Sequence, residues 1–416
     1  MEKIAVIGAG ISGLAIAQML KATNNVVVFE KEERPGGLIK CENVGGNLYH
    51  TVGGHVFNSK RQDVLEWFWK FFDRTNEFTK TIRKAVVNFD NNLWVDYPIE
   101  NHVYMFPKNI VESVICDLLT ISKASKSVDN VSFEDFLLQN FGKTLYQLYF
   151  QPYNEKVWKR NLSEVPLSWL DGKLPMPNVR EILYNNFCHV EESAMVHSSF
   201  FYPKKNGSQF LADRLADGLH IEYNQEIAKM ERKGNLWIIN GMAFDKVIFS
   251  GNIKALPYLL DDEFITVEND CFIERLEYHG TTSVFCEIDK NPYSWIYMPS
   301  RNHASHRIIC TGNFSPYNNV SNDRITASIE FSDFASEELV QESLKQIPLN
   351  PRYICRRYTQ YTYPIQNADT RKQIKIIKQK LAKANLFLLG RFAEWEYYNM
   401  DAAIGAAMDL SKIINS

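Results

Sequence analysis

Three glycines near the N-terminus constrain the fold of this chain more than any other feature. The segment Gly8-Ala-Gly10-Ile11-Ser12-Gly13 follows a short apolar run at residues 3–7 and precedes an apolar, helix-forming stretch at residues 14–20. A second β-branched run, at residues 25–30, ends on Glu30. Strand, glycine turn, helix, strand and terminal acid together form the βαβ unit of a dinucleotide-binding fold.

Each residue type in this unit serves dinucleotide binding. Gly8 allows the tight turn, Gly10 lets the backbone approach a pyrophosphate, and Gly13 lets helix and strand pack closely. The helix that begins at Ile11 and Ser12 presents roughly half a positive charge to the phosphates. Glu30 can accept hydrogen bonds from the adenosine ribose. A simple βα turn would account for the glycines but not for the acid.

Two further segments favour FAD as the cofactor. Residues 31–38, which contain Arg34, Gly36, Gly37 and Leu38, resemble the FAD-binding extension of the glutathione-reductase and amine-oxidase superfamily. The resemblance implies that Arg34 neutralises a second phosphate. Near the C-terminus, the glycine turn Gly390-Arg391 and a helix start at Met400-Asp401-Ala402 resemble the superfamily element that points a helix N-terminus at the flavin ring. Such a dipole favours negative charge on a reduced flavin.

The motifs between these segments resemble the UDP-galactopyranose mutase family, in order and over nearly the whole chain. They are Val52-Gly53-Gly54-His55-Val56-Phe57, Tyr97-Pro-Ile-Glu-Asn101, the stretch 151–158, Phe201-Tyr-Pro-Lys204, His306-Arg307, Tyr363-Pro364 and the stretch 390–399. The resemblance implies an isomerase that converts the pyranose of a nucleotide sugar such as UDP-galactose into a furanose (galactofuranose), for polysaccharide biosynthesis. The implied reaction has no net redox change, and N5 of reduced FAD acts as nucleophile at the anomeric carbon.

The resemblance also implies roles for individual residues. Six residues would be catalytic. His55 would lie beside the flavin, and Lys173 and Arg307 would bind the diphosphate. Tyr363 and Tyr397 would donate phenolic hydrogen bonds to the diphosphate, and Asn399 would position the substrate. The substrate-binding group comprises Tyr97 and Glu100 at the nucleotide and Tyr153 and Trp158 around the sugar. Gly54 and His55 count as cofactor-binding as well.

Without the resemblance, several of these residues could have a purely structural role. His55 without its two glycines would be an ordinary loop histidine, and Arg307 could be a solvated strand arginine. Trp158 could be a core aromatic. Tyr397 and Tyr398 adjoin, so only one faces a pocket if the segment is extended. The other histidines have no spacing typical of a metal site, and no metal is expected.

Two positions depart from the family pattern. Lys173 stands where the family has an arginine, and an ammonium meets a phosphate only as a point charge. Glu100 stands where related eukaryotic-type enzymes have a glutamine, and an ionised acid cannot donate to a base carbonyl. Both departures concern the nucleotide end of the substrate, so the identity of the sugar and of the nucleotide stays open.

Two other functions are compatible with the FAD-binding motifs. An FAD-dependent oxidoreductase of the amine-oxidase or protoporphyrinogen-oxidase type would have the same cofactor fingerprints with an apolar substrate cavity. A flavin-binding protein without turnover, acting as a partner in glycan synthesis, would also retain them. Phosphate-dependent sugar binding separates the mutase from the oxidase, and turnover separates it from the inactive partner.

Composition limits the kinds of partner and the cellular compartment that we expect for this chain. The net charge of −3 argues against nucleic-acid binding, and no window approaches the roughly 18 apolar residues of a membrane span. The seven cysteines are scattered and never form a C-x-x-C pair, which favours reduced thiols in the cytoplasm. A helical insertion is a common dimer contact, so a homodimer stays open.

The pattern of elements predicts an α/β fold built from interleaved domains. We expect a Rossmann-type FAD-binding domain from residues 1–80, 200–265 and 380–416, a helical domain at 105–195, and an antiparallel β-sheet substrate domain from 81–104 and 266–379. Within these, residues 86–95 predict a hairpin around Asp90-Asn-Asn92. Strands are expected at 221–249 and 271–315, and helices at 321–348 and 369–384.

Overall fold

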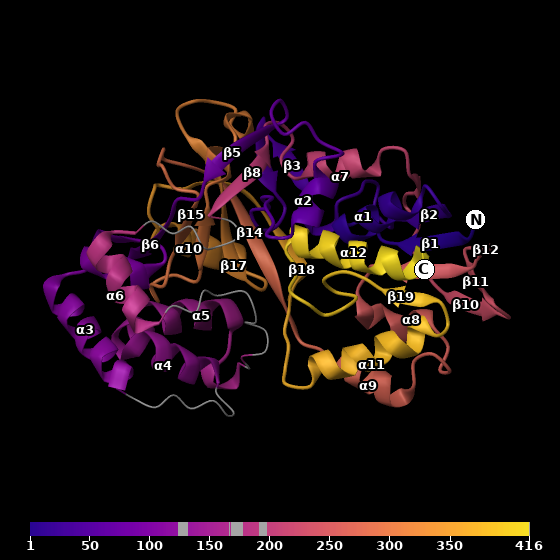
Figure 1. Cartoon of the computed structure of the whole chain (residues 1–416). Coiled ribbons are helices and arrows are strands. Elements are labelled where there is room, and N and C mark those ends of the chain that lie inside the picture. Colours follow the sequence, from indigo (N-terminus) through magenta and orange to yellow (C-terminus); the bar gives the residue numbers. More distant parts are fainter. Residues whose placement is uncertain (124–131, 166, 168–177, 191–197, 416) are drawn as a thin grey trace.

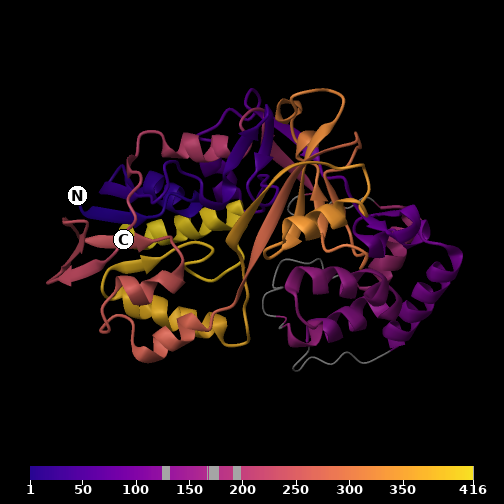
Figure 2. The same ribbon diagram turned by 180° about the vertical axis from the view of Figure 1, so that it is seen from behind.

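The structure is a computed structural model that describes residues 1–123, 132–165, 167, 178–190 and 198–415. Lys173 lies outside the described residues. A parallel sheet with both chain termini occupies one end of the molecule, an antiparallel sheet the middle, and a group of helices the other end (Figure 1). The view from behind shows the same order (Figure 2). The predicted mixed α/β architecture is thereby confirmed.

The parallel sheet is assembled from three distant parts of the chain. Its strands run in the order β19 (Leu386–Leu388), β13 (Lys246–Phe249), β1 (Lys3–Ile7), β2 (Asn25–Phe29) and β9 (His220–Glu222). All four pairings are parallel. Residues 4–7 of the central strand are buried, as expected of a strand covered on both faces.

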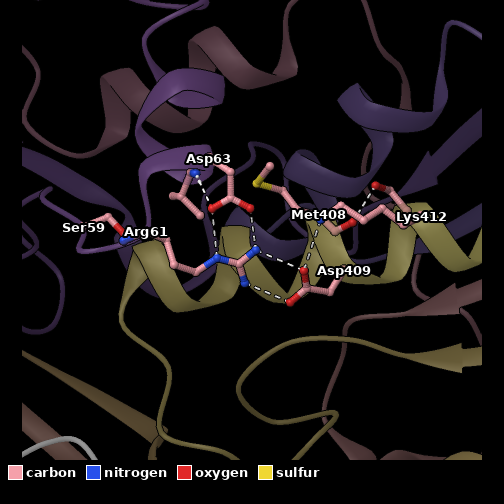
Figure 3. A network of polar contacts seen from close by, with 8 residues as sticks. Ser59, Arg61, Asp63, Met408, Asp409 and Lys412 are labelled. Carbon is pink, nitrogen blue, oxygen red and sulfur yellow. Dashed lines mark hydrogen bonds and ion pairs between the residues drawn. The ribbon is translucent and has the colours of Figure 1, made fainter.

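Helix α1 (Ile11–Leu20) packs beside the C-terminal helix α12 (Met400–Asn415), with α7 (Gln209–Ala216) also against it. The short helix α2 (Gln62–Phe68) is joined to α12 by charges at the surface (Figure 3). Arg61, just before α2, lies 2.7 Å from Asp63 and 2.8 Å from Asp409 of α12. These contacts connect residues 348 positions apart, so both ends of the chain contribute to one layer.

The antiparallel sheet has seven strands in the order β18, β14, β17, β16, β15, β6 and β7. Their bounds are Arg352–Pro364, Tyr278–Ile288, Ile325–Ser332, Arg307–Ile309, Trp295–Tyr297, Ala85–Phe89 and Leu93–Asp96. Only the pairing of β15 with β6 is parallel. The predicted hairpin is confirmed as β6 and β7 around a turn at Asp90–Asn92.

The prediction of helix over 321–348 is wrong for its first half, where β17 lies. Residues 325, 327, 329 and 331 are apolar and alternate with polar residues, which is a period of two rather than 3.6. The polar side of this strand is buried as well, at Thr326, Ser328 and Glu330. Only α10 (Glu337–Leu344) is helical there, and the next predicted helix is confirmed as α11 (Thr370–Ala382).

The helical group consists of α3 (Lys108–Lys123), α4 (Phe133–Leu145), α5 (Gln151–Trp158) and α6 (Val179–Cys188). A π-helical turn at Tyr146–Phe150 joins α4 to α5. Its core is continuous with that of the antiparallel sheet, because Phe141 and Leu145 share one cluster with Val87 and Trp295. The helices are therefore packed on the sheet and carry α5 to the edge of the site described below.

Smaller elements complete the chain. They are β3 (Cys41–Val44) with β4 (Asn47–His50), β5 (Phe78–Ile82) with β8 (Ser199–Pro203), a three-stranded sheet of β10 (Met230–Lys233), β11 (Leu236–Ile239) and β12 (Met242–Phe244), and helices α8 (Leu256–Leu259) and α9 (Val267–Glu274). Because α9 extends to Glu274, the strands expected from 271 begin only at Tyr278. None of the helices in the described part of the chain has the length and apolar character of a membrane span.

Candidate active site

The turn between β1 and α1 leaves room for a ligand at one glycine and none at another. A Cβ on Gly13 would lie 1.9 Å from the carbonyl oxygen of Gly8, so helix and turn pack without space for a side chain. A Cβ on Gly10 would meet no protein atom within 4 Å. Glu30 is buried and accepts the Ala9 N–H at 2.7 Å, which fixes the acid at the end of β2. These features fit a dinucleotide.

The second glycine pair packs on the first. The Gly36 N–H donates to the Ala9 carbonyl at 2.9 Å, and Gly36 forms a β-bridge with Gly10. The Arg34 guanidinium donates to the Cys41 carbonyl at 2.9 Å and to Gln209 Oε1 at 3.3 Å. Protein groups thus already hold Arg34 in place beside this loop.

A cavity of about 220 Å³ lies where the dinucleotide-binding region meets the antiparallel sheet. It is lined by Leu38, Val52, Gly53, Gly54, His55, Val56, Arg83, Trp295, Tyr297, Arg307, Thr362, Tyr363, Arg391, Tyr397, Asn399 and Met400. Nine of these are residues that the sequence selected: Leu38, Gly54, His55, Arg307, Tyr363, Arg391, Tyr397, Asn399 and Met400. Segments from five distant parts of the chain therefore converge on this one space.

The Gly-Gly-His loop is fixed from beneath by the sheet. Gly53 adopts a positive φ of 70° and donates its N–H to Glu330 at 2.8 Å. A Cβ on Gly54 would lie 2.5 Å from Ile309 of β16, so only glycine fits there. These two contacts seat the loop and bring His55 into the cavity wall.

His55 is a neutral ring with a free nitrogen. Burial, helped by His50 and Arg391, lowers the pKa of His55 to about 3. Its Nε2 is buried and has no hydrogen-bond partner among the described residues. A buried polar atom without a partner is costly, and a polar cofactor atom in the adjoining cavity would satisfy it.

Arg307 and Glu330 form a buried ion pair that leads to Tyr363. Arg307 donates through Nε to Glu330 and through Nη2 to Tyr363 Oη at 2.9 Å. Burial opposes ionisation of Glu330, but the charge of Arg307 and the hydrogen bond with His306 hold the pKa of Glu330 below its ordinary value. Burial lowers the pKa of His306 to about 4, so Arg307 is the cation that Glu330 meets. Burial also raises the pKa of Tyr363, which keeps the phenol protonated.

Tyr397 extends this polar wall towards α12. Its ring stacks on that of Tyr363 at 5.4 Å and 9°, and the Arg391 guanidinium lies 4.7 Å from its centroid. Arg391 donates to the carbonyls of Tyr398 and Thr362, each at 3.0 Å. Of the two adjacent tyrosines, Tyr397 is therefore the one whose ring lines the cavity. Asn399 is the residue just before α12, and its carbonyl accepts the Ala403 N–H as an N-cap residue does.

None of the four residues expected at the substrate is on the lining of this cavity. Tyr97 and Tyr153 pack on the ring of Tyr297, at 4.9 and 5.5 Å. Glu100 is 5% exposed, and Trp158 is 6% exposed within the core shared by helices and sheet. Tyr97 and Tyr153 thus contact Tyr297, which is itself on the cavity lining.

Sequence reasoning missed five residues at this site. They are Arg83, Trp295, Tyr297 and Thr362 on the lining, and Glu330 directly behind it. No motif marks them, because their proximity depends on strand register. Tyr297 lies opposite Arg307, and Arg307 lies opposite Glu330. Glu330 is the one acid in a segment where apolar and polar residues alternate, and this pattern could have indicated it. The segment was predicted to be helical, so the pattern was not used.

Comparisons with known proteins agree with this picture. Residues 6–75 match a family described as an NAD(P)-binding Rossmann-like domain. A dTDP-fucopyranose mutase of Escherichia coli is 22% identical over 99% of this chain and 98% of its own length. A UDP-galactopyranose mutase of Mycoplasma genitalium is 22% identical over 96% of this chain and 92% of its own.

Solved structures give the same fold. The structure of a reduced UDP-galactopyranose mutase matches with a TM-score of 0.87 at 19% identity, over 100% of this chain and 96% of that one. A putative protoporphyrinogen oxidase from Exiguobacterium sp. 255-15 matches with a TM-score of 0.76 at 13% identity, over 99% and 98%.

Fold and cavity define an α/β protein with a Rossmann-type dinucleotide-binding domain beside an antiparallel sheet. Within that class, the resemblance to the UDP-galactopyranose mutases is confirmed over nearly the whole chain. It extends to a relative named for a different nucleotide and a different sugar.

Substitutions at Gly10 and Gly13 separate cofactor binding from packing. Gly10 has an ordinary φ of −74° and open space at its Cβ. Gly10→Ala is therefore expected to leave the free energy of unfolding of the apoprotein within about 0.5 kcal/mol of wild type while FAD retention falls. Gly13→Ala is expected to destabilise the apoprotein itself by about 1–3 kcal/mol. Urea unfolding of apoprotein and absorbance of bound flavin measure the two effects. A Gly10→Ala protein with full flavin content would contradict the assignment.

Acid is expected to destabilise the protein through its buried histidines. Burial lowers the pKa of His50 to about 4, whereas an unfolded histidine titrates near 6.5. The unfolded state therefore takes up this proton first, so full stability holds above about pH 6.5 and falls by about 1.4 kcal/mol per unit below it. His50→Asn is expected to reduce the slope of unfolding free energy against pH between about 6 and 4.5 by this amount. His220→Asn is the comparison: this exposed histidine lies 2.9 Å from Glu222, and removal of a solvent-screened pair is expected to change the slope less than His50→Asn does.

Proposed function

We propose that this protein isomerises the sugar of a nucleotide sugar between pyranose and furanose forms, with FAD that is active when reduced. The observation that carries the proposal is the convergence of Arg307, Tyr363 and Tyr397 on the cavity that the Gly-Gly-His loop and the start of α12 also line. A leaving diphosphate needs cationic and phenolic groups of this kind.

The described residues fit FAD. Gly10 leaves space at the turn, Glu30 is held at the end of β2, and His55 Nε2 is buried without a partner next to the cavity. The N-terminus of α12 lies at the cavity, where its dipole favours negative charge. When bound and reduced, FAD would supply a nucleophilic electron pair at N5 for the anomeric carbon.

The chain's own residues would stabilise the leaving group. As the bond from the anomeric carbon to the diphosphate breaks, negative charge grows on the phosphate oxygen. Tyr363 accepts a hydrogen bond from Arg307, which leaves its own O–H free to donate to that oxygen. Glu330 holds the Arg307 guanidinium in a fixed orientation, so little reorganisation is needed during the reaction.

The proposal also includes the chemical class of the substrate. The relatives are named for UDP-galactopyranose and dTDP-fucopyranose, and the departures at Lys173 and Glu100 concern the nucleotide end. We take a pyrimidine nucleoside diphosphate sugar as the substrate class. The cytoplasmic location and a homodimer stay predictions.

Turnover of candidate substrates tests the proposal. Dithionite-reduced holoenzyme is incubated with UDP-galactopyranose and with dTDP-fucopyranose, and the products are separated by chromatography. Formation of a furanose from either sugar supports the mutase. If neither sugar nor a wider panel gives a furanose, the proposal fails. Oxygen consumption dependent on an apolar amine or porphyrin-like substrate would favour the oxidase instead.

Tyr363→Phe is expected to lower kcat/KM by about 10-fold or more, because it removes one hydrogen bond to a charged oxygen. The unfolding temperature should change little, since the ring and its stacking on Tyr397 remain. Tyr358→Phe makes the same change on the same strand at a position that is 43% exposed, and it should leave kcat/KM unchanged. Equal activity of Tyr363→Phe and wild type would contradict the proposed role.

A further inference from the structure

A row of polar side chains crosses the wall that the antiparallel sheet gives to the cavity. Glu330, Arg307 and Tyr297 lie opposite one another on β17, β16 and β15. Directly opposed residues point to the same face, with Cβ atoms about 5 Å apart. The row continues beyond the sheet, because the Tyr297 hydroxyl accepts a hydrogen bond from Arg83 Nη2. Arg83 lies between β5 and β6 and also lines the cavity.

This row carries two cations, Arg307 and Arg83. Glu330 balances the positive charge of Arg307 at one end, while the diphosphate of a nucleotide sugar carries two negative charges. In the part of the chain that the structure describes, no aspartate or glutamate lines the cavity, and its other two cations are Arg391 and Arg83. Arg391 donates to two backbone carbonyls beside α12. Arg83 is the cation at the other end of the row from the Arg307–Glu330 pair.

Arg83 is also held in a defined position. Its guanidinium lies 5.2 Å from the ring centroid of Trp295 and 5.5 Å from that of Tyr97. Contacts with aromatic faces and a hydrogen bond to Tyr297 restrict the side chain before any ligand enters. A planar guanidinium held in this way can bind a phosphate through two N–H groups.

We propose that Arg83 binds one phosphate of the nucleotide diphosphate while Arg307 binds the other, with the Tyr297 hydroxyl between them. This inference rests on the proposed function and adds a phosphate-binding residue to it. It also explains why Tyr97, one of the residues expected at the nucleotide, packs beside Arg83 rather than on the cavity lining.

Equilibrium binding to the oxidised holoenzyme tests Arg83 without turnover. UDP and dTDP are the probes, and uridine is the probe without phosphate; affinities come from titration calorimetry. Arg83→Gln is expected to weaken diphosphate binding at least about 10-fold and uridine binding less than about 2-fold. Lys84→Gln removes the same charge at the neighbouring exposed position and should change neither affinity by more than about 2-fold.

Arg83→Lys keeps the charge but loses the planar donor set, so its diphosphate affinity is expected to lie between those of wild type and Arg83→Gln. If Arg83→Gln does not retain FAD or fold, Arg83→Lys decides alone: weakening of about 3-fold or more supports the inference, and unchanged affinity overturns it.

Arg307→Gln distinguishes the failure of this inference from that of the proposed function. Loss of diphosphate binding in Arg307→Gln with wild-type affinity in Arg83→Gln overturns the role of Arg83 alone. Wild-type affinity in both variants overturns the proposed function as well.

Discussion

The buried carboxylate of Glu330 is the contact on which the site depends. It accepts a hydrogen bond from the Gly53 N–H and pairs with Arg307, so a single side chain of β17 connects the Gly-Gly-His loop to the arginine of β16. A buried charge is tolerated only when it is paired and hydrogen-bonded. Removal of either partner would leave an uncompensated charge, and the relative positions of loop and strand would no longer be fixed.

From this contact the cavity is built outwards by strand register. Register places Tyr297 beside Arg307, and the end of β18 brings Tyr363 to the other side of the same guanidinium. The stacking of Tyr363 on Tyr397 then joins the sheet to the segment that begins α12. The dinucleotide-binding region and the antiparallel sheet therefore meet through polar side chains that are themselves candidates for chemistry.

The local part of this architecture could be predicted from sequence, and the non-local part could not. Gly8 to Gly13 and Glu30 belong to a contiguous βαβ unit, so spacing alone specifies their arrangement. The resemblance to known motifs located His55, Arg307, Tyr363 and Tyr397, all of which line the cavity. Arg83 and Tyr297 carry no motif, and they come together only through the pairing of β15 with β6 and β16. Residues 325–332 alternate with a period of two but were predicted to be helical, so Glu330 was not recognised as a residue that faces the site.

The position of α12 beside α1 has a consequence for biogenesis. The cavity needs the loop around residue 54 and also the segment from Arg391 to Met400, near the opposite end of the chain. Strand β19, which enters the parallel sheet just before that segment, follows the other four strands of this sheet in the chain. A growing chain can form the first βαβ unit early, but it cannot form this cavity until Met400 has been made. A cofactor that needs this cavity would therefore bind only after the segment from Arg391 to Met400 has been made and has folded.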